Sequence, residues 1–160
     1  MTIDLMGLFG SASIGVYSLA TEKMAIAPPQ MSKAKAKRLE ECLQVKVIQT
    51  TIGESALIGA LTSANSNGVV LPHYVTEEEV DAIKSAVSDI NIAVMETKRT
   101  AYGNMVLAND KGAIADPRLK EESLLRIADA LGVEVVPGEI AGLPYVGSLA
   151  TATNKGVLAH

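Results

Sequence analysis

Cysteine-based nucleophilic catalysis by this chain would need its single thiol, Cys42, together with an imidazole and a carboxylate that activate it. The two imidazoles belong to His73 and His160, and neither stands at a metal-like spacing or beside an evident carboxylate partner. Cys42 follows Leu39 by three residues and precedes Leu43, a spacing typical of the apolar face of a helix, where cysteine packs as a small hydrophobe. We therefore expect no catalytic residue, no metal and no cofactor.

The composition indicates a cytoplasmic protein with an aliphatic core. Of 160 residues, 48% are hydrophobic but only 3% are aromatic. The single cysteine fits a reducing compartment, and the N-terminal stretch lacks the basic region of a secretory signal. No window approaches the roughly 18 consecutive apolar residues of a membrane span. The net charge of −4 argues against affinity based on many phosphate contacts but suits a basic protein surface.

The elements that must position any site are repeated every 44 residues. The turn "ANSNGVVLP" at 64–72 returns as "ANDKGAIAD" at 108–116 and "ATNKGVLAH" at 152–160, and "ATEKMAIAP" at 20–28 keeps the same register. A glycine precedes each turn, at Gly15, Gly59, Gly103 and Gly147. The apolar residues after each glycine are interpreted as the first strand of a hairpin, and Asn67-Gly68 is a strong turn signal because both residues tolerate positive φ.

Helical spacing follows each hairpin. Thr76 and Glu79 form a potential capping box before the apolar stripe of Val80, Ile83 and Val87. The other two stripes are Leu124, Ile127 and Leu131, ended by Gly132, and Leu39, Cys42 and Leu43, which follow the potential N-cap Ser32. Strand-like segments come next at 45–52, 90–97 and 133–140. Each unit is therefore predicted to be strand–strand–helix–strand.

One repeat domain is expected over 1–160, with units at about 10–53, 54–97, 98–141 and an incomplete 142–160. A helical array is excluded because each unit contains one helix and about three strands. A single unit would leave the apolar faces of its sheet and its helix half exposed, so the units must pack on one another. Because the fourth unit stops after its hairpin, we expect the chain to be a fragment of a longer protein, less stable than that protein.

Three stretches carry a family resemblance: "TTIGESALIGALTSANSNGVVLPHYVTEEEVDAIK", "TAYGNMVLANDKGAIADP" and "LGVEVVPGEIAGLPYVGSLATATNKGVLAH". They closely resemble the translation initiation factor 6 family, the ribosome anti-association factors of archaea and eukaryotes. The resemblance implies an α/β fold, the pentein-type α-β propeller of five units around a pseudo-fivefold axis. It also implies a non-enzymatic role, which is binding to the large ribosomal subunit on its intersubunit face.

The implied partners are a ribosomal protein beside the sarcin–ricin loop and ribosomal RNA, with no membrane and with the protein acting as a monomer. By occupying this face the protein would block the small subunit, and eukaryotic relatives also take part in large-subunit maturation. Two alternatives remain open at this point. One is a pentein-type enzyme that modifies guanidino groups, and the other is a generic propeller scaffold that binds another protein.

The candidate ribosome-binding residues follow from breaks in the repeat and from the resemblance. Asn104 occupies the position that Val16, Ala60 and Ser148 hold in the other units, and it could equally be a strand residue that caps a neighbouring backbone group. Lys98 and Arg99 stand just before this strand and are candidates for contacting RNA. Ala60, Ser148, Leu149 and Asp110 complete the set, although Asp110 also suits turn chemistry.

We expect structural roles for two further groups of residues. Asn65 and Asn109, matched by Thr21 and Thr153, are expected to hydrogen-bond their own turns. The basic run Lys33, Lys35, Lys37 and Arg38 is interpreted as a solvated helix face, partly neutralised by Glu40 and Glu41.

Overall fold

The computed structural model describes residues 3–160 and repeats one order of elements along the chain. The first unit contains α1 (Ile14–Tyr17), β1 (Leu19–Ala20), β2 (Met24–Ala27), α2 (Lys33–Leu43) and β3 (Lys46–Gln49). The second contains α3 (Ile58–Leu61), β4 (Ser63–Ala64), β5 (Gly68–Pro72), α4 (Glu77–Ala86) and β6 (Asn91–Met95). The third contains α5 (Tyr102–Met105), β7 (Val106–Ala108), β8 (Ala113–Ala115), α6 (Glu121–Leu131) and β9 (Val135–Pro137). The last elements are α7 (Val146–Leu149), β10 (Ala150–Ala152) and β11 (Val157–Ala159).

The fold is mixed α/β with four small, separate sheets. Three sheets have the orders β1-β2-β3, β4-β5-β6 and β7-β8-β9, and the fourth is the hairpin β10-β11. In each three-stranded sheet the first two strands pair antiparallel and the last two pair parallel across the intervening helix. The predicted strand–strand–helix–strand order is thereby confirmed. None of the sheets in residues 3–160 closes into a barrel, and no helix there is both long and apolar enough to cross a bilayer.

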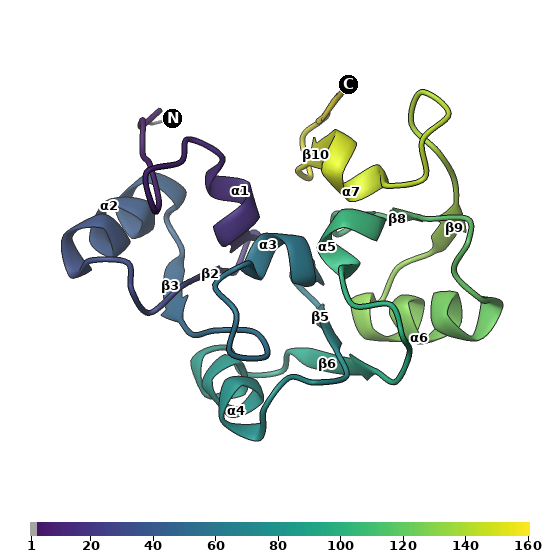
Figure 1. Cartoon of the computed structure of the whole chain (residues 1–160), viewed down its shortest axis with the longest axis horizontal. Helices are drawn as coiled ribbons and strands as arrows, with labels where there is room; N and C mark the ends of the chain where they lie inside the picture. Colours follow the sequence, from purple (N-terminus) through teal and green to yellow (C-terminus); the bar gives the residue numbers. More distant parts are fainter. Residues whose placement is uncertain (1–2) are drawn as a thin grey trace.

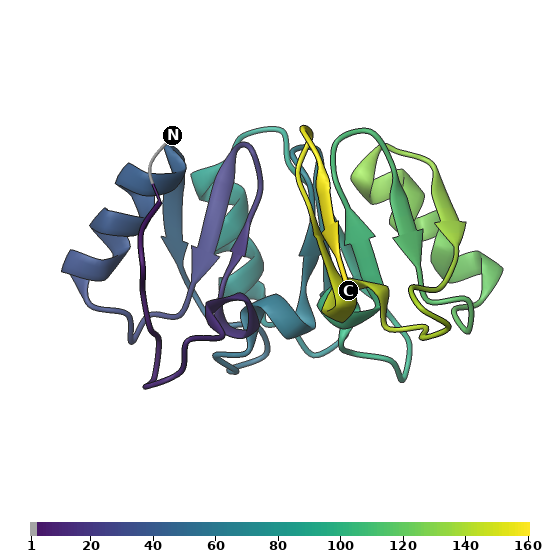
Figure 2. The same cartoon turned by 90° about the horizontal axis from the view of Figure 1, so that it is seen from above.

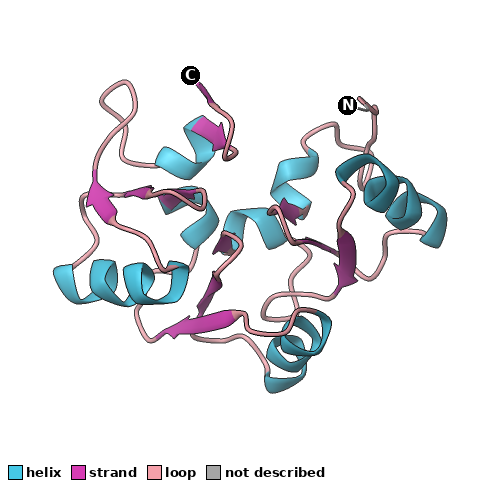
Figure 3. Ribbon diagram, turned by 180° about the vertical axis from the view of Figure 1, so that it is seen from behind, coloured by secondary structure: helices cyan, strands magenta, loops and turns pink. Residues whose placement is uncertain are grey.

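The units follow one another around an open arc (Figure 1). Strands and short helices lie toward the inside of the arc, and the long helices α2, α4 and α6 lie outside, as the view from behind also shows (Figure 3). Figure 2 shows that the molecule has two different ends. The short-helix end carries α1, α3, α5 and α7, and the turn end carries the hairpin turns at 21–23, 65–67, 109–112 and 153–156.

Two hydrophobic clusters lie between consecutive units, and β5 contributes to both of them. Along β5, Val69 and Leu71 pack in one cluster with Ile26 of the first unit, whereas Val70 packs in another with Met105 of the third. Val69, Val70 and Leu71 are all fully buried. Side chains alternate between the faces of a strand, so one strand joins two cores.

The helix boundaries predicted from sequence are confirmed where they depend on local contacts. Ser32 Oγ accepts a hydrogen bond from the Lys35 amide at the start of α2. Thr76 and Glu79 form a complete capping box on α4, and Gly132 ends α6 in the left-handed conformation at φ 62°.

Three local predictions were wrong. The strands predicted at 45–52, 90–97 and 133–140 are shorter, because residues beyond 49 and 137 leave the ladder for tight loops such as the bridge between Ile52 and Ser55. The residues after each repeated glycine form a one-turn helix, so Asn104 lies on α5 and not on a strand. Neither Asn67 nor Gly68 has positive φ; the Asn65 side chain closes this turn by accepting hydrogen bonds from both amides.

The repeated glycines bring the short helices into backbone contact. A Cβ atom on Gly59 would lie 1.9 Å from the Gly15 carbonyl oxygen, one on Gly103 1.9 Å from that of Gly59, and one on Gly147 2.0 Å from that of Gly103. Real Cβ atoms do not approach oxygen so closely. Glycine is required at these positions because only a residue without a side chain allows this approach.

We predict that Gly103→Ala lowers the free energy of unfolding by about 3 kcal/mol, since the added methyl group must displace the backbone of α3. Chemical denaturation measures the loss. Gly15→Ala is the matched control, because nothing lies within 4 Å of its added Cβ atom. It should change stability by less than about 0.5 kcal/mol or increase it slightly, as alanine favours a helix. Equal losses in the two variants would contradict the packing argument.

Candidate functional site

A central cavity of about 650 Å³ is lined by equivalent positions from all four units. Val16, Ala60, Asn104 and Ser148 line it together with the four repeated glycines. Helices α3 and α5 contact each other, as do α5 and α7, so the structure brings Ala60, Asn104 and Ser148 close together. The position that breaks the repeat in the sequence therefore faces a shared surface.

Asn104 presents a half-buried amide to this cavity. Its side chain makes no hydrogen bond within residues 3–160, and only its backbone amide is bonded, to the Ala101 carbonyl. The alternative interpretation, in which the amide caps a neighbouring backbone group, has no support in this geometry. Ser148 is exposed and Leu149 is half-buried at the end of α7, where its carbonyl accepts from the His160 amide.

Lys98 and Arg99 lie in the loop between β6 and α5, at the same end of the molecule as Asn104. Both side chains are exposed. The loop is fixed by Thr97, whose hydroxyl accepts from the Arg99 amide and shares a 2.7 Å hydrogen bond with the Tyr102 hydroxyl. Lys98 and Arg99 also line a separate cavity of about 530 Å³ beside α6, which the sequence did not predict.

Asp110 lies at the opposite, turn end, away from the other candidates. Its carboxylate accepts hydrogen bonds from the Ser66 amide and hydroxyl at 2.7 and 2.8 Å and from the Asn154 amide at 2.7 Å. Burial raises the pKa of Asp110, but these hydrogen bonds lower it by more, so the pKa lies below its ordinary value. The carboxylate joins three consecutive turns.

The asparagines of the turn end extend the same connection between units. Asn65 accepts from its own turn, as predicted, and also donates to the carbonyl groups of Asn109 and Leu131. Asn109 likewise donates to the Thr153 carbonyl. The sequence signal for these contacts was the recurrence of asparagine at a step of 44 residues, which turn chemistry alone does not require.

The three residues that could have supported nucleophilic catalysis lie on separate elements. Cys42 is on α2 and is only partly buried, so the expected core position is confirmed in part. His73 is exposed directly after β5, and His160 is exposed directly after β11. Among residues 3–160, no group of three His, Cys, Asp or Glu side chains could hold a metal ion.

Comparison with known proteins identifies the family. The chain matches the model of the eIF-6 family over residues 3–160. It is 44% identical to translation initiation factor 6 of Methanocaldococcus jannaschii over 165 residues, which covers the whole chain and 72% of that relative. The corresponding proteins of Staphylothermus marinus and Pyrococcus horikoshii are 39% and 37% identical, and the chain covers 71% and 72% of their lengths. The chain belongs to the eIF-6 family of translation initiation factors.

We predict that Asp110 makes stability depend on pH in acid. Because its folded-state pKa is lowered, its contribution is complete above the unfolded pKa of about 3.9 and is lost as pH falls through the folded value. Asp110→Asn should cost about 1 kcal/mol at pH 7, allowing for partial exposure, and less at pH 3. Denaturant titrations at both pH values measure this, with exposed Asp129→Asn as the control. An equal loss of stability at both pH values would show that the shape of the Asp110 side chain, and not its charge, causes the effect.

Proposed function

We propose that this translation factor binds the intersubunit face of the large ribosomal subunit and prevents premature association with the small subunit. The short-helix end is the docking surface. The single observation that carries the assignment of this surface is the Asn104 amide, which faces the central cavity without a hydrogen-bond partner in the described chain. This amide is therefore free to bond to a partner, and its place at a break in the repeat favours binding.

The distribution of the other candidates supports the same end. Ala60 and Ser148 line the same cavity as Asn104, Leu149 follows Ser148 on α7, and Lys98 and Arg99 lie in the loop before α5. The Asp110 carboxylate is instead occupied by contacts between turns. We therefore propose docking through the first group and a structural role for Asp110.

The proposed partners are a basic ribosomal protein beside the sarcin–ricin loop and, at the Lys98 and Arg99 loop, ribosomal RNA. The net charge of −4 favours association with a basic protein surface. We further propose that the protein acts as a cytoplasmic monomer without catalysis and contributes to large-subunit biogenesis. Binding by itself would exclude the small subunit sterically, so this role requires no chemical step.

We also propose that the chain is one repeat domain of the pentein-type α-β propeller, with units that begin near residues 10, 54, 98 and 142. Three sheets with one topology and glycines that contact at each step of 44 residues support this architecture. Superposing consecutive units in an experimental structure should give a rotation near one fifth of a turn. Units related by translation along a line would contradict it.

We predict that Asn104→Ala weakens cosedimentation with isolated large subunits, because a hydrogen bond that alanine cannot make is lost at the interface. Removing one partner of such a bond costs about 1–3 kcal/mol, or roughly 5- to 150-fold in affinity. The melting temperature should change little, since the amide makes no hydrogen bond within residues 3–160.

Asn65→Ala is the control for this experiment. Asn65 is 2% exposed and its side chain makes four hydrogen bonds, so its loss should lower stability more than binding. The docking assignment fails if Asn104→Ala binds normally but melts several degrees lower. Sedimentation of the wild-type protein with small subunits but not with large subunits would reject the proposed function itself.

A further inference from the structure

The 530 Å³ cavity beside α6 is rich in cations although the chain as a whole is acidic. It is lined by Lys98, Arg99, Arg118, Lys120 and Arg126, against the carboxylates of Glu96 and Glu122. Arg118 is paired with Asp116, and Arg126 donates to the Val94 carbonyl. Lys98, Arg99 and Lys120 are exposed and form no salt bridge within residues 3–160. Three cations at one cavity are therefore available to an external anion.

In the second unit, a carboxylate of the protein itself occupies the equivalent place. There the Glu79 carboxylate, 5% exposed, accepts from the Thr51 hydroxyl at 2.5 Å and from the amides of Gly53 and Glu54 at 2.7 and 2.9 Å. It also accepts from the Thr76 amide at 3.0 Å, which completes the cap of α4. An internal anion thus occupies the space between this loop and the helix start.

The third unit has no carboxylate at the position of Glu79. The position of Glu79 is taken by Ser123, which is 7% exposed, lines the cavity and has a hydroxyl with no hydrogen-bond partner in the described chain. The N-cap position, Ser32 and Thr76 in the first two units, is Lys120, whose side chain does not cap α6. The Lys98 amide, equivalent to that of Glu54, also has no acceptor within residues 3–160.

We propose that this cavity binds a backbone phosphate of RNA, in place of the carboxylate that the chain supplies in the second unit. The amides of Glu121 and Glu122 at the start of α6, the Ser123 hydroxyl and the Lys98 amide supply donors, and Lys98, Arg99 and Lys120 supply charge. This inference rests on the proposed function, in which the neighbouring loop faces the ribosome, and it specifies a phosphodiester as the group that is recognised there.

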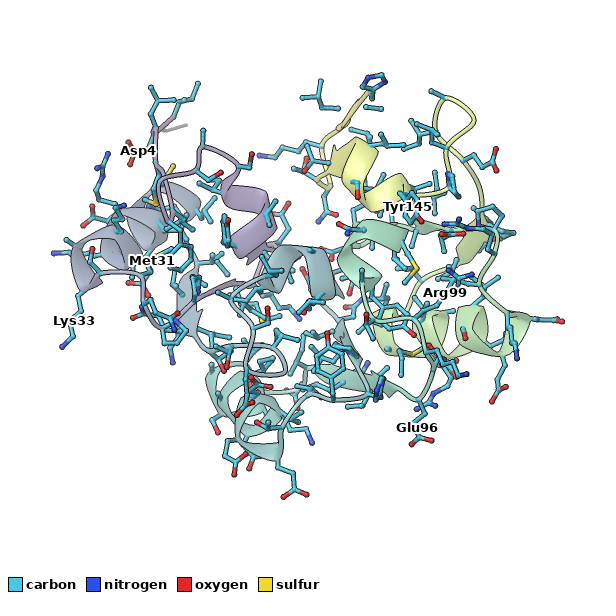
Figure 4. All side chains as sticks on the ribbon, in the orientation of Figure 1. Asp4, Met31, Lys33, Glu96, Arg99 and Tyr145 are labelled. Atoms are coloured by element: carbon cyan, nitrogen blue, oxygen red, sulfur yellow. The ribbon has the colours of Figure 1, made fainter. Side chains whose placement is uncertain are left out.

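A stacking surface beside the cavity favours RNA over an acidic peptide. The Arg118 guanidinium lies 4.6 Å from the centre of the Tyr145 ring, and Tyr145 is 48% exposed. Figure 4 shows Tyr145 on the same side of the molecule as Arg99. Unpaired bases stack on aromatic rings and on arginine planes, so a nucleotide whose phosphate enters the cavity finds a platform for its base.

The test measures binding of a short, fluorescently labelled single-stranded RNA to the full chain by anisotropy over a series of salt concentrations. Ser123→Glu restores the carboxylate of the second unit, and it should lower RNA affinity about tenfold or more because like charges then meet. Lys98→Gln should weaken binding and reduce the slope of log K against log salt by about 1. Ser123→Ala, which preserves the packing volume more closely, should lose affinity by about fivefold.

Lys33→Gln is the matched control, since it removes the same charge from an exposed residue of α2 on the far side of the molecule (Figure 4). It should leave affinity and salt slope unchanged. RNA affinity that Ser123→Glu and Lys98→Gln do not alter overturns the proposal. Tighter binding of a polyglutamate peptide than of RNA, lost in the same variants, overturns the assignment to RNA.

Cosedimentation with large subunits separates this inference from the proposed function. Subunit binding whose affinity and salt slope are unchanged in Lys98→Gln and Ser123→Glu would overturn the phosphate site alone. RNA binding that depends on the cavity, in a chain that does not sediment with large subunits, would support the phosphate site and overturn the proposed function alone.

Discussion

The arrangement of this protein depends on a backbone contact between glycines 44 residues apart. Each short helix from α3 onward places a glycine against the carbonyl group of the preceding glycine, with no room for a methyl group. This contact fixes how far each unit turns from the last and where the residue after each glycine points. Because Ala60, Asn104 and Ser148 follow those glycines directly, the same constraint assembles the surface that we propose as the docking site.

The repeat also supplies an internal reference for interpreting individual side chains. At the turn end, asparagine and aspartate bond from one unit to the next, and the pattern continues from residue 65 to residue 154. At the short-helix end, equivalent positions differ in chemistry. Asn104 replaces small or apolar residues, and Ser123 with Lys120 replaces a carboxylate with its hydroxyl cap. Side-chain hydrogen bonds between units therefore repeat at the turn end, whereas side chains at equivalent positions of the short-helix end differ from unit to unit.

The sequence predicted those features whose causes lie within a few residues or within the repeat. Thr76 with Glu79 and the terminal Gly132 specified helix ends through local hydrogen bonds and backbone conformation. It did not predict that Asn104 lies on a helix, because a single turn is too short to form alone and depends on contacts with the neighbouring units. The partners of Asp110 lie 44 residues away in both directions, so turn chemistry explained only part of its role. The cavity beside α6 forms where the loop after β6 meets the start of α6, and local sequence patterns do not predict that contact. The change of the N-cap residue from Ser32 and Thr76 to Lys120 was visible in the sequence.

Hydrogen–deuterium exchange with and without isolated large ribosomal subunits tests the central claim most directly, because it reports each end of the molecule separately. We expect bound large subunits to slow exchange in the loop at 96–101 and in α5 and α7, while the turns at 65–67 and 109–112 exchange as in the unbound protein. Protection confined to those turns, with unchanged exchange at 96–105, would show that the docking surface is the opposite end.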